Sequence, residues 1–172
     1  MLTVCFHGAE STGKSVMAAR LNQRFGWPVV AEFGREYCET HGTDLVMADL
    51  LAIAEGHMAA TQAAARARPE VLILDTDQLM TAAWAQMLFE EVPGALLGYA
   101  KADLYLLFEP DVPWVADGTR FFGESDERGQ FAALAQSMLV LAGVRWERIF
   151  GSWADRETQI LAAIAAAASP NP

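Results

Sequence analysis

The chain has 172 residues, 53% of them hydrophobic, which favours one domain with a substantial core over two domains of ordinary size. Its formal net charge of −10 leaves no basic surface for a phosphodiester backbone, so general nucleic-acid binding is disfavoured. Two cysteines, Cys5 and Cys38, stand without metal-ligand spacing, which is typical of a reducing compartment and not of a disulfide framework.

The N-terminal segment MLTVCFHGAE has neither the positive region nor the cleavage site of a signal peptide. Its apolar run, residues 2–6, is predicted to be a buried strand. The most apolar later stretch, residues 160–168, is too short and too rich in alanine to span a bilayer. These features predict a cytoplasmic protein with no membrane partner.

The segment GAESTGKS follows the first predicted strand and precedes a predicted helix over residues 16–25. It matches G-x-x-x-x-G-K-[ST], the phosphate-binding loop, in the strand-to-helix context that the motif requires. Its glycines allow a tight turn whose N–H groups meet phosphate at a helix N-terminus. Lys14 is predicted to reach the β- and γ-phosphates, and the Ser15 hydroxyl to bind Mg²⁺. The expected nucleotide contacts are Gly8, Ala9, Glu10, Ser11, Thr12, Gly13, Lys14, Ser15 and Val16.

A polar cluster follows the second predicted strand, residues 28–33. In AEFGREYCE, the charged side chains of Glu32, Arg35 and Glu36 stand within five residues. At the carboxyl edge of an open α/β sheet they would face the same crevice as the phosphate-binding loop. A carboxylate there can orient an acceptor hydroxyl or take its proton. The alternative is a solvated charged turn.

Short apolar runs and helical patterns alternate through the rest of the chain. This alternation predicts an α/β fold, with a parallel sheet covered by helices on both faces. The pattern predicts helices from Thr43 or Asp44 to Pro69, over 81–89, over 130–142 and from Asp155, and strands over 71–74, 104–108 and 145–150.

Acidic residues close the apolar strand VLIL in the sequence VLILDTD. A phosphate-bound Mg²⁺ usually needs a carboxylate at the end of a neighbouring strand, and Asp75 stands there. Asp75 is therefore the predicted metal-side carboxylate. Asp77 is predicted either as a functional carboxylate or as the N-cap of the next helix.

The segment over residues 110–130 is polar, glycine-bearing and irregular. A segment that closes over a nucleotide can deliver cations to a phosphoryl-transfer transition state while it excludes water. Arg120 and Arg128 are the candidate cations of such a lid. The alternative is that each arginine pairs with a nearby surface carboxylate, such as Asp117 or Asp126.

Four motifs, in this order, are GAESTGKS, EFGREYCE, ILDTDQLMT, and PWVADGTR followed by ERGQF. By these motifs the chain resembles, over nearly its whole length, the ribosylnicotinamide kinase domain of bacterial NadR proteins, a P-loop kinase of the AAA_28 type. The resemblance implies a three-layer α/β/α P-loop NTPase fold with a five-stranded parallel sheet and a lid. It also places the first strand beside the strand that ends in DTD.

The resemblance implies transfer of the γ-phosphoryl group of ATP to the 5′-hydroxyl of nicotinamide riboside, giving nicotinamide mononucleotide, with ATP and Mg²⁺ as cofactors. It implies a base contact from GSWADR, residues 151–156. The chain departs from full-length members, because it is expected to lack their adenylyltransferase and DNA-binding domains, and this leaves the acceptor open. The implied roles are metal support by Asp75, riboside contacts by Glu32, Arg35 and Glu36, hydroxyl activation by Glu32 or Asp77, and lid cations from Arg120 and Arg128.

Other functions compete with this interpretation. A P-loop kinase of another nucleoside-like compound would share the mechanism and differ in its pocket. An ATP-binding or ATP-hydrolysing switch module is the alternative from another class. The N-K-x-D motif of GTPases is absent from the sequence, and the spacing of Gly8 and Gly13 does not fit the G-x-G-x-x-G of dinucleotide-binding oxidoreductases.

Overall fold

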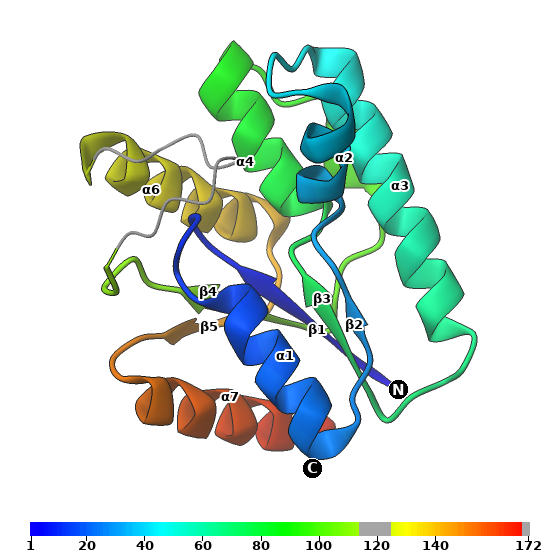
Figure 1. The fold of residues 1–172 in the computed structure, drawn as a ribbon, viewed down its shortest axis with the longest axis vertical. Helices are drawn as coiled ribbons and strands as arrows, with labels where there is room; N and C mark the ends of the chain where they lie inside the picture. The colour runs from blue at the N-terminus through cyan, green and yellow to red at the C-terminus, as the bar shows by residue number, and fades with distance from the viewer. Residues whose placement is uncertain (114–124, 170–172) are drawn as a thin grey trace.

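In the computed structural model, which describes residues 1–113 and 125–169, five parallel strands form one sheet in the order β2-β3-β1-β4-β5 (Figure 1). Strand β1 lies beside β3, as the resemblance implied, and Phe6 is paired in register with Asp75. The α/β fold class predicted from the sequence is confirmed. The strands are β1 (Leu2–His7), β2 (Val29–Val30), β3 (Val71–Asp75), β4 (Leu104–Phe108) and β5 (Trp146–Ile149).

Helices cover both faces of this sheet. One apolar cluster joins α1 and α7 to one face, and a larger cluster joins the other five helices to the opposite face (Figure 1). Residues alternate between the two clusters along β1, where Val4 and Phe6 face one side and Cys5 the other. The helices are α1 (Lys14–Phe25), α2 (Phe33–His41), α3 (Met47–Ala65), α4 (Gln78–Phe89), α5 (Gly94–Gly98), α6 (Ser125–Ala142) and α7 (Trp153–Ala168).

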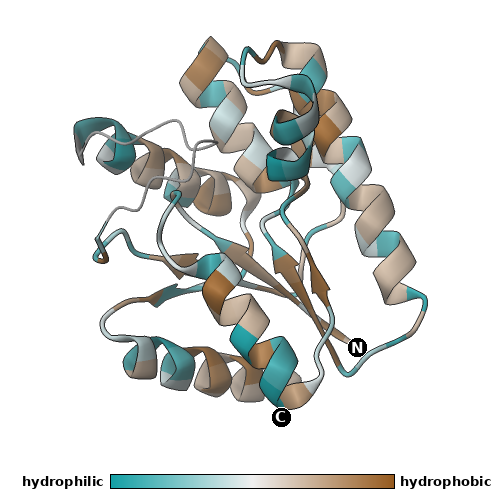
Figure 2. Ribbon diagram, in the orientation of Figure 1, coloured by the Kyte–Doolittle hydropathy of each residue, from teal (hydrophilic) through white to brown (hydrophobic). Residues whose placement is uncertain are grey.

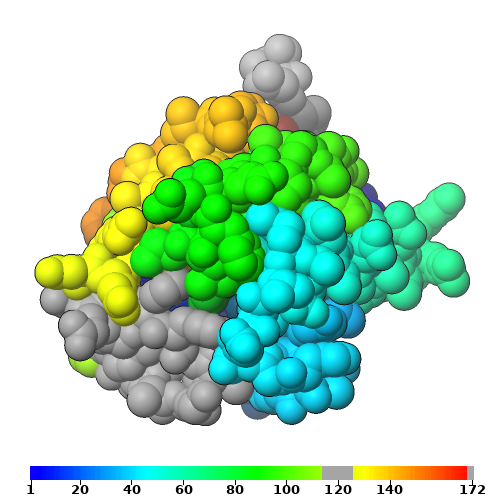
Figure 3. Space-filling model, turned by 90° about the horizontal axis from the view of Figure 1, so that it is seen from above, coloured from blue at the N-terminus to red at the C-terminus, as the bar shows by residue number. Residues whose placement is uncertain are grey.

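The central strands are mostly apolar because both of their faces are covered. All residues of β3 and of β4 are buried, and Figure 2 shows the hydrophobic colour concentrated in the middle of the sheet. Seen from above, the residues of α4 (green) lie between those of α6 (yellow) and those near the start of α3 (cyan) (Figure 3). No helix in residues 1–113 or 125–169 combines the length and the apolar character needed to cross a membrane.

The sequence-based prediction was wrong between residues 28 and 41. The predicted strand over 28–33 pairs only at Val29 and Val30, and the charged cluster, for which no helix was predicted, lies in and just before the helix α2. Its inward residues, Phe33 and Tyr37, are four apart and pack on the larger cluster, and Cys38 on the same helix is buried. The charged residues between them obscure this short apolar face in the sequence.

All five predicted helices begin at other residues than expected. Helices α1 and α6 begin at Lys14 and Ser125, earlier than predicted, and each of the other three has a local cap. Helix α3 starts at Met47, because the Asp49 carboxylate accepts a hydrogen bond from the Val46 N–H (2.8 Å) and so closes the first turn. Helix α4 starts three residues earlier than predicted, since Asp77 caps it. Helix α7 starts at Trp153, after an N-cap at Ser152. In these three helices a local cap sets the start.

Candidate active site

The phosphate-binding loop lies at the carboxyl edge of the sheet, between β1 and α1. Gly8 and Gly13 have φ angles of 124° and 90°, in the region that favours glycine. A Cβ atom on Gly8 would lie 2.5 Å from the carbonyl oxygen of Phe108, and one on Gly13 would lie 2.6 Å from two ring carbons of Trp153. Neither position therefore accepts a side chain, and both glycines are required for the shape of the loop.

Lys14 is the first residue of α1 and is almost wholly buried. Its Nζ atom donates hydrogen bonds to the carbonyl oxygens of Gly8 (2.8 Å) and Ala9 (2.7 Å), so the ammonium group spans its own loop. The Thr12 hydroxyl donates to the Ala9 oxygen as well (2.8 Å). Because these carbonyls are held by donors, the following N–H groups face the other way, as an anion site needs.

Two adjoining hollows open at this edge of the sheet. The cradle hollow lies over the phosphate-binding loop, and the lateral hollow lies among α2, α3 and α4. The cradle hollow is lined by residues 10–16, Glu32 and Arg35. The lateral hollow is lined by Glu10, Glu32, Gly34, Arg35, Cys38, Leu45, Leu50, Ile53, Thr76, Met80, Thr81 and Trp84.

Glu10, Glu32 and Arg35 belong to the walls of both hollows. Glu32 is the N-cap residue of α2, and its Oε2 lies 3.7 Å from Nε of Arg35, one turn along the helix. Of the cluster predicted after the second strand, Glu36 is the exception, because it is exposed and is not among the residues that line either hollow. Glu32 and Arg35 thus stand at the junction between the two hollows.

The lateral hollow combines apolar walls with negative charge. Trp84 lines it from α4 and packs against Phe131 of α6, with ring centroids 4.9 Å apart. Cys38 lines it from α2, and burial, followed by the carboxylates of Glu32 and Glu10, raises the pKa of its thiol. The thiol therefore stays protonated near neutral pH, and a cationic ligand would meet a favourable potential there.

Asp75 ends β3 beside Phe6 and is buried, with 4% of its surface exposed. Its Oδ1 atom is buried without a hydrogen-bond partner among the described residues. An unpaired buried carboxylate oxygen is costly unless something else binds it. The Asp75 carboxylate and the Ser15 hydroxyl are hard oxygen donors of the kind that Mg²⁺ takes together with phosphate oxygens, so these residues fit the cation.

Asp77, like Asp75, is not among the residues that line the two hollows. Its Oδ1 accepts the N–H of Leu79 (2.9 Å), and its Oδ2 accepts the hydroxyl of Tyr105 (2.5 Å). Of the two interpretations left open by the sequence, the geometry is that of a helix N-cap. Burial raises the pKa of Asp77, although the hydrogen bonds from Tyr105 and Leu79 oppose that shift.

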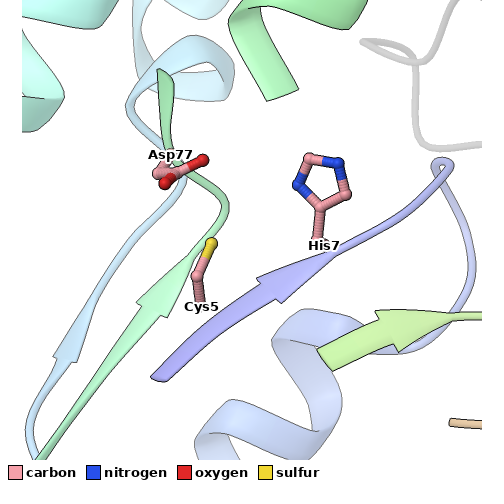
Figure 4. A group of neighbouring side chains, drawn as sticks. All are labelled: Cys5, His7 and Asp77. Atoms are coloured by element: carbon pink, nitrogen blue, oxygen red, sulfur yellow. The ribbon is translucent and has the colours of Figure 1, made fainter. Parts of the chain in front are cut away.

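The side chains of Cys5, His7 and Asp77 form a buried group in which the three point toward one another (Figure 4). Their possible ligand atoms lie within 4.8 Å of one another. The His7 Nε2 atom is 2.9 Å from the Ala135 oxygen, and burial lowers the pKa of His7 to about 3, so the ring is neutral. Both oxygens of Asp77 already accept hydrogen bonds. We therefore interpret Cys5, His7 and Asp77 as a polar part of the core.

Arg128, at the start of α6, reaches back to the phosphate-binding loop. It donates from Nη2 to the Ser11 oxygen and from Nη1 to the Val112 oxygen, both at 3.1 Å. Arg128 therefore lies beside the phosphate-binding loop, and its role as a lid cation stays a prediction. Arg120, the other predicted lid cation, lies outside the described residues.

The structure also brings to the site residues to which the sequence analysis gave no role of their own. Trp84 and Thr81 line the lateral hollow from α4, and their signal in the sequence is that of ordinary helix residues. Arg156 was included only as part of a possible base contact. Its side chain is fully buried and donates to the Thr12 oxygen of the phosphate-binding loop (3.0 Å).

A sequence model of the AAA_28 family, described as an AAA domain, matches residues 3–156. The chain is 34% identical over 155 residues to the trifunctional NAD biosynthesis/regulator protein NadR of Escherichia coli K12, and 35% identical over 145 residues to that of Salmonella typhimurium LT2. These alignments cover 86% and 80% of this chain but 38% and 35% of the relatives. The chain therefore spans little more than a third of each relative's length.

Solved structures agree in fold. A NadR protein in complex with NR superposes with a TM-score of 0.80 at 22% identity, over 97% of this chain and 49% of the other. A NadR protein with NAD and AMP-PNP gives 0.73 at 19% identity, over 99% and 50%. Deoxyadenosine kinase from M. mycoides gives 0.65 at 10% identity, over 96% and 100%. With the phosphate-binding loop, the sheet order and the family match in agreement, the chain belongs to the AAA_28 family and has the P-loop kinase fold.

Proposed function

We propose that this chain is an ATP-dependent kinase that phosphorylates the 5′-hydroxyl of nicotinamide riboside and releases nicotinamide mononucleotide and ADP. The observation that supports it best is the adjacency of the two hollows, which share Glu10, Glu32 and Arg35. A phosphate-binding site beside a second pocket that can take an acceptor is the arrangement that a nucleoside kinase needs. The related NadR structures with NR and with AMP-PNP supply both ligands of this reaction.

The lateral hollow suits a nicotinamide nucleoside by its chemistry. Nicotinamide riboside carries a positive charge on its aromatic ring, and the hollow offers the indole of Trp84 with the carboxylates of Glu10 and Glu32. Aromatic faces and carboxylates both attract such a cation.

In the proposed reaction, the phosphate-binding loop holds the triphosphate and Lys14 meets its β- and γ-phosphates. The Glu32 carboxylate takes the proton of the 5′-hydroxyl as that oxygen attacks the γ-phosphorus and the bond to the ADP oxygen breaks. Arg35, 3.7 Å from Glu32, keeps the carboxylate oriented. Arg128 adds positive charge at the phosphate side.

Mg²⁺ is part of the proposal. It would be held by the Ser15 hydroxyl and the Asp75 carboxylate, and when bound it supplies charge neutralisation on the phosphate oxygens. The unpaired, buried Oδ1 of Asp75 supports this assignment. A cytoplasmic location is proposed as well, because Cys5 and Cys38 are free thiols.

The test is steady-state kinetics of the purified chain with MgATP and a panel of acceptors. The panel holds nicotinamide riboside, the ordinary ribonucleosides and deoxyribonucleosides, and a control without acceptor. The proposal expects the highest kcat/KM with nicotinamide riboside. A higher kcat/KM with another nucleoside would leave a kinase with a different acceptor, and ATP consumption that no acceptor increases would favour a hydrolysing switch module.

A further inference from the structure

Arg156 is a charged residue with no exposed surface, and the reaction described above gives it no part. Arginine is almost never fully buried unless partners compensate its charge. It stands in the first turn of α7, where a positive charge gains nothing from the helix dipole. Its contacts with the rest of the chain must therefore account for its burial.

The guanidinium group of Arg156 joins three loops at the carboxyl edge of the sheet. It donates from Nε to the Gly151 oxygen (3.0 Å) after β5, and from Nη1 to the Thr12 oxygen (3.0 Å) in the phosphate-binding loop. It donates from Nη2 to the Glu109 oxygen (3.2 Å) and to the Asp111 carboxylate, both after β4. Only the planar fork of an arginine can meet acceptors in so many directions at once.

The bond to Thr12 fixes one peptide of the phosphate-binding loop. In a trans peptide the carbonyl of one residue and the N–H of the next point in opposite directions. Because Arg156 holds the Thr12 carbonyl on its own side, the Gly13 N–H is turned away from it. Gly13 lines the cradle hollow. A Cβ atom on Gly13 would lie 2.6 Å from the ring of Trp153, the first residue of α7, so this ring also restricts the position. One turn of α7 thus constrains this peptide twice.

We infer that Arg156 is a positioning residue for nucleotide binding: it orients the Thr12–Gly13 peptide so that the loop is preorganised for a di- or triphosphate. The inference rests on the proposed function, in which nucleotide phosphates occupy the cradle hollow. It assigns to α7 a part in phosphate binding that acts through the backbone of the loop. Arg156 itself is not among the residues that line either hollow.

The test compares Arg156→Lys with Arg148→Lys, which makes the same change in the neighbouring strand β5. Arg148 pairs with the Glu109 side chain and does not contact the phosphate-binding loop. Calorimetry measures the affinities for MgADP and for nicotinamide riboside, and kinetics gives KM for each substrate. A lysine cannot keep all the hydrogen bonds, so Arg156→Lys is expected to lower the MgADP affinity by about ten-fold or more. Its riboside affinity, and both affinities of Arg148→Lys, are expected to stay within about two-fold.

A second variant, Arg156→Ala, tests the mechanism by chemical rescue. Millimolar guanidinium is expected to restore MgADP affinity in this variant, whereas the same concentration of urea, which lacks the charge, is not. Should the alanine variant fail to fold, Arg156→Lys decides alone. The inference is overturned if Arg156→Lys leaves MgADP affinity unchanged, or if it lowers nucleotide and riboside affinity together, since the second result indicates a purely structural role.

The same measurements separate this inference from the proposed function. Wild-type protein that binds MgADP but phosphorylates no riboside refutes the proposed function alone, and the calorimetric comparison still decides the role of Arg156. Wild-type protein that binds no nucleotide refutes both.

Discussion

The hydroxyl of Tyr105 donates a 2.5 Å hydrogen bond to Oδ2 of Asp77, and both side chains are buried. This pair joins β4 to the start of α4 inside the core. Tyr105→Phe removes the hydroxyl and leaves Oδ2 of the buried Asp77 carboxylate without this hydrogen bond. The loss of the bond is expected to lower the free energy of unfolding by about 1–3 kcal/mol. Chemical denaturation measures this loss.

The kinase activity of Tyr105→Phe at 25 °C is expected to stay within about two-fold of wild type, because Asp77 and Tyr105 lie outside both hollows. Tyr37→Phe is the matched control. The Tyr37 hydroxyl donates to Asp49 (2.6 Å) at a half-buried position, where a water molecule can replace the lost hydroxyl group. A loss of activity in Tyr105→Phe without loss of stability would make Asp77 the hydroxyl-activating carboxylate instead of Glu32.

Glu32→Gln keeps the size of the side chain at the junction of the hollows and removes its basicity. Removal of a general base is expected to lower kcat by about 10²–10⁴-fold, with little change in nucleotide affinity. Glu36→Gln, on the exposed side of the same helix, is the control and is expected to behave as wild type. Equal kinetics for Glu32→Gln and wild type would contradict the role of Glu32 as the general base.

Asp75→Asn tests the metal assignment. The variant keeps the shape of the side chain at the end of β3 and loses the charge that would support Mg²⁺. It is expected to need a higher Mg²⁺ concentration for half-maximal activity, and chelation of Mg²⁺ is expected to abolish wild-type transfer. Because Oδ1 has no hydrogen-bond partner among the described residues, the variant should melt near the wild-type temperature. An unchanged Mg²⁺ dependence would contradict the assignment.

Stability is expected to fall in acid because of buried histidines. Burial lowers the pKa of His57 from 6.5 to about 4, so the unfolded chain binds a proton that the folded chain excludes. The free energy of unfolding is therefore lost as the pH falls from about 6.5 toward about 4, by about 3 kcal/mol for this group. His57→Leu should reduce the slope over this window, whereas His41→Gln, which changes an exposed ring on α2, should not. Equal slopes for His57→Leu and wild type would contradict this account.

How much the sequence predicts depends on the distance between interacting residues. The phosphate-binding loop is predicted because its residues are consecutive, and Asp75 because it directly follows an apolar strand. Helix α2 was missed since its short apolar face, Phe33 with Tyr37, lies among charged residues. The Arg156 to Thr12 bond joins positions 144 residues apart, and no local pattern indicates it.

The central claim is phosphoryl transfer to nicotinamide riboside, and its most direct test is the mass of the product formed from MgATP by wild type and by Lys14→Ala. Lys14 bonds to loop carbonyls and contributes little to the core, so the variant should fold. The account predicts nicotinamide mononucleotide in equal amount to ADP from wild type, and a loss of at least about 100-fold in Lys14→Ala. ADP without nicotinamide mononucleotide, or transfer by Lys14→Ala at the wild-type rate, would contradict it.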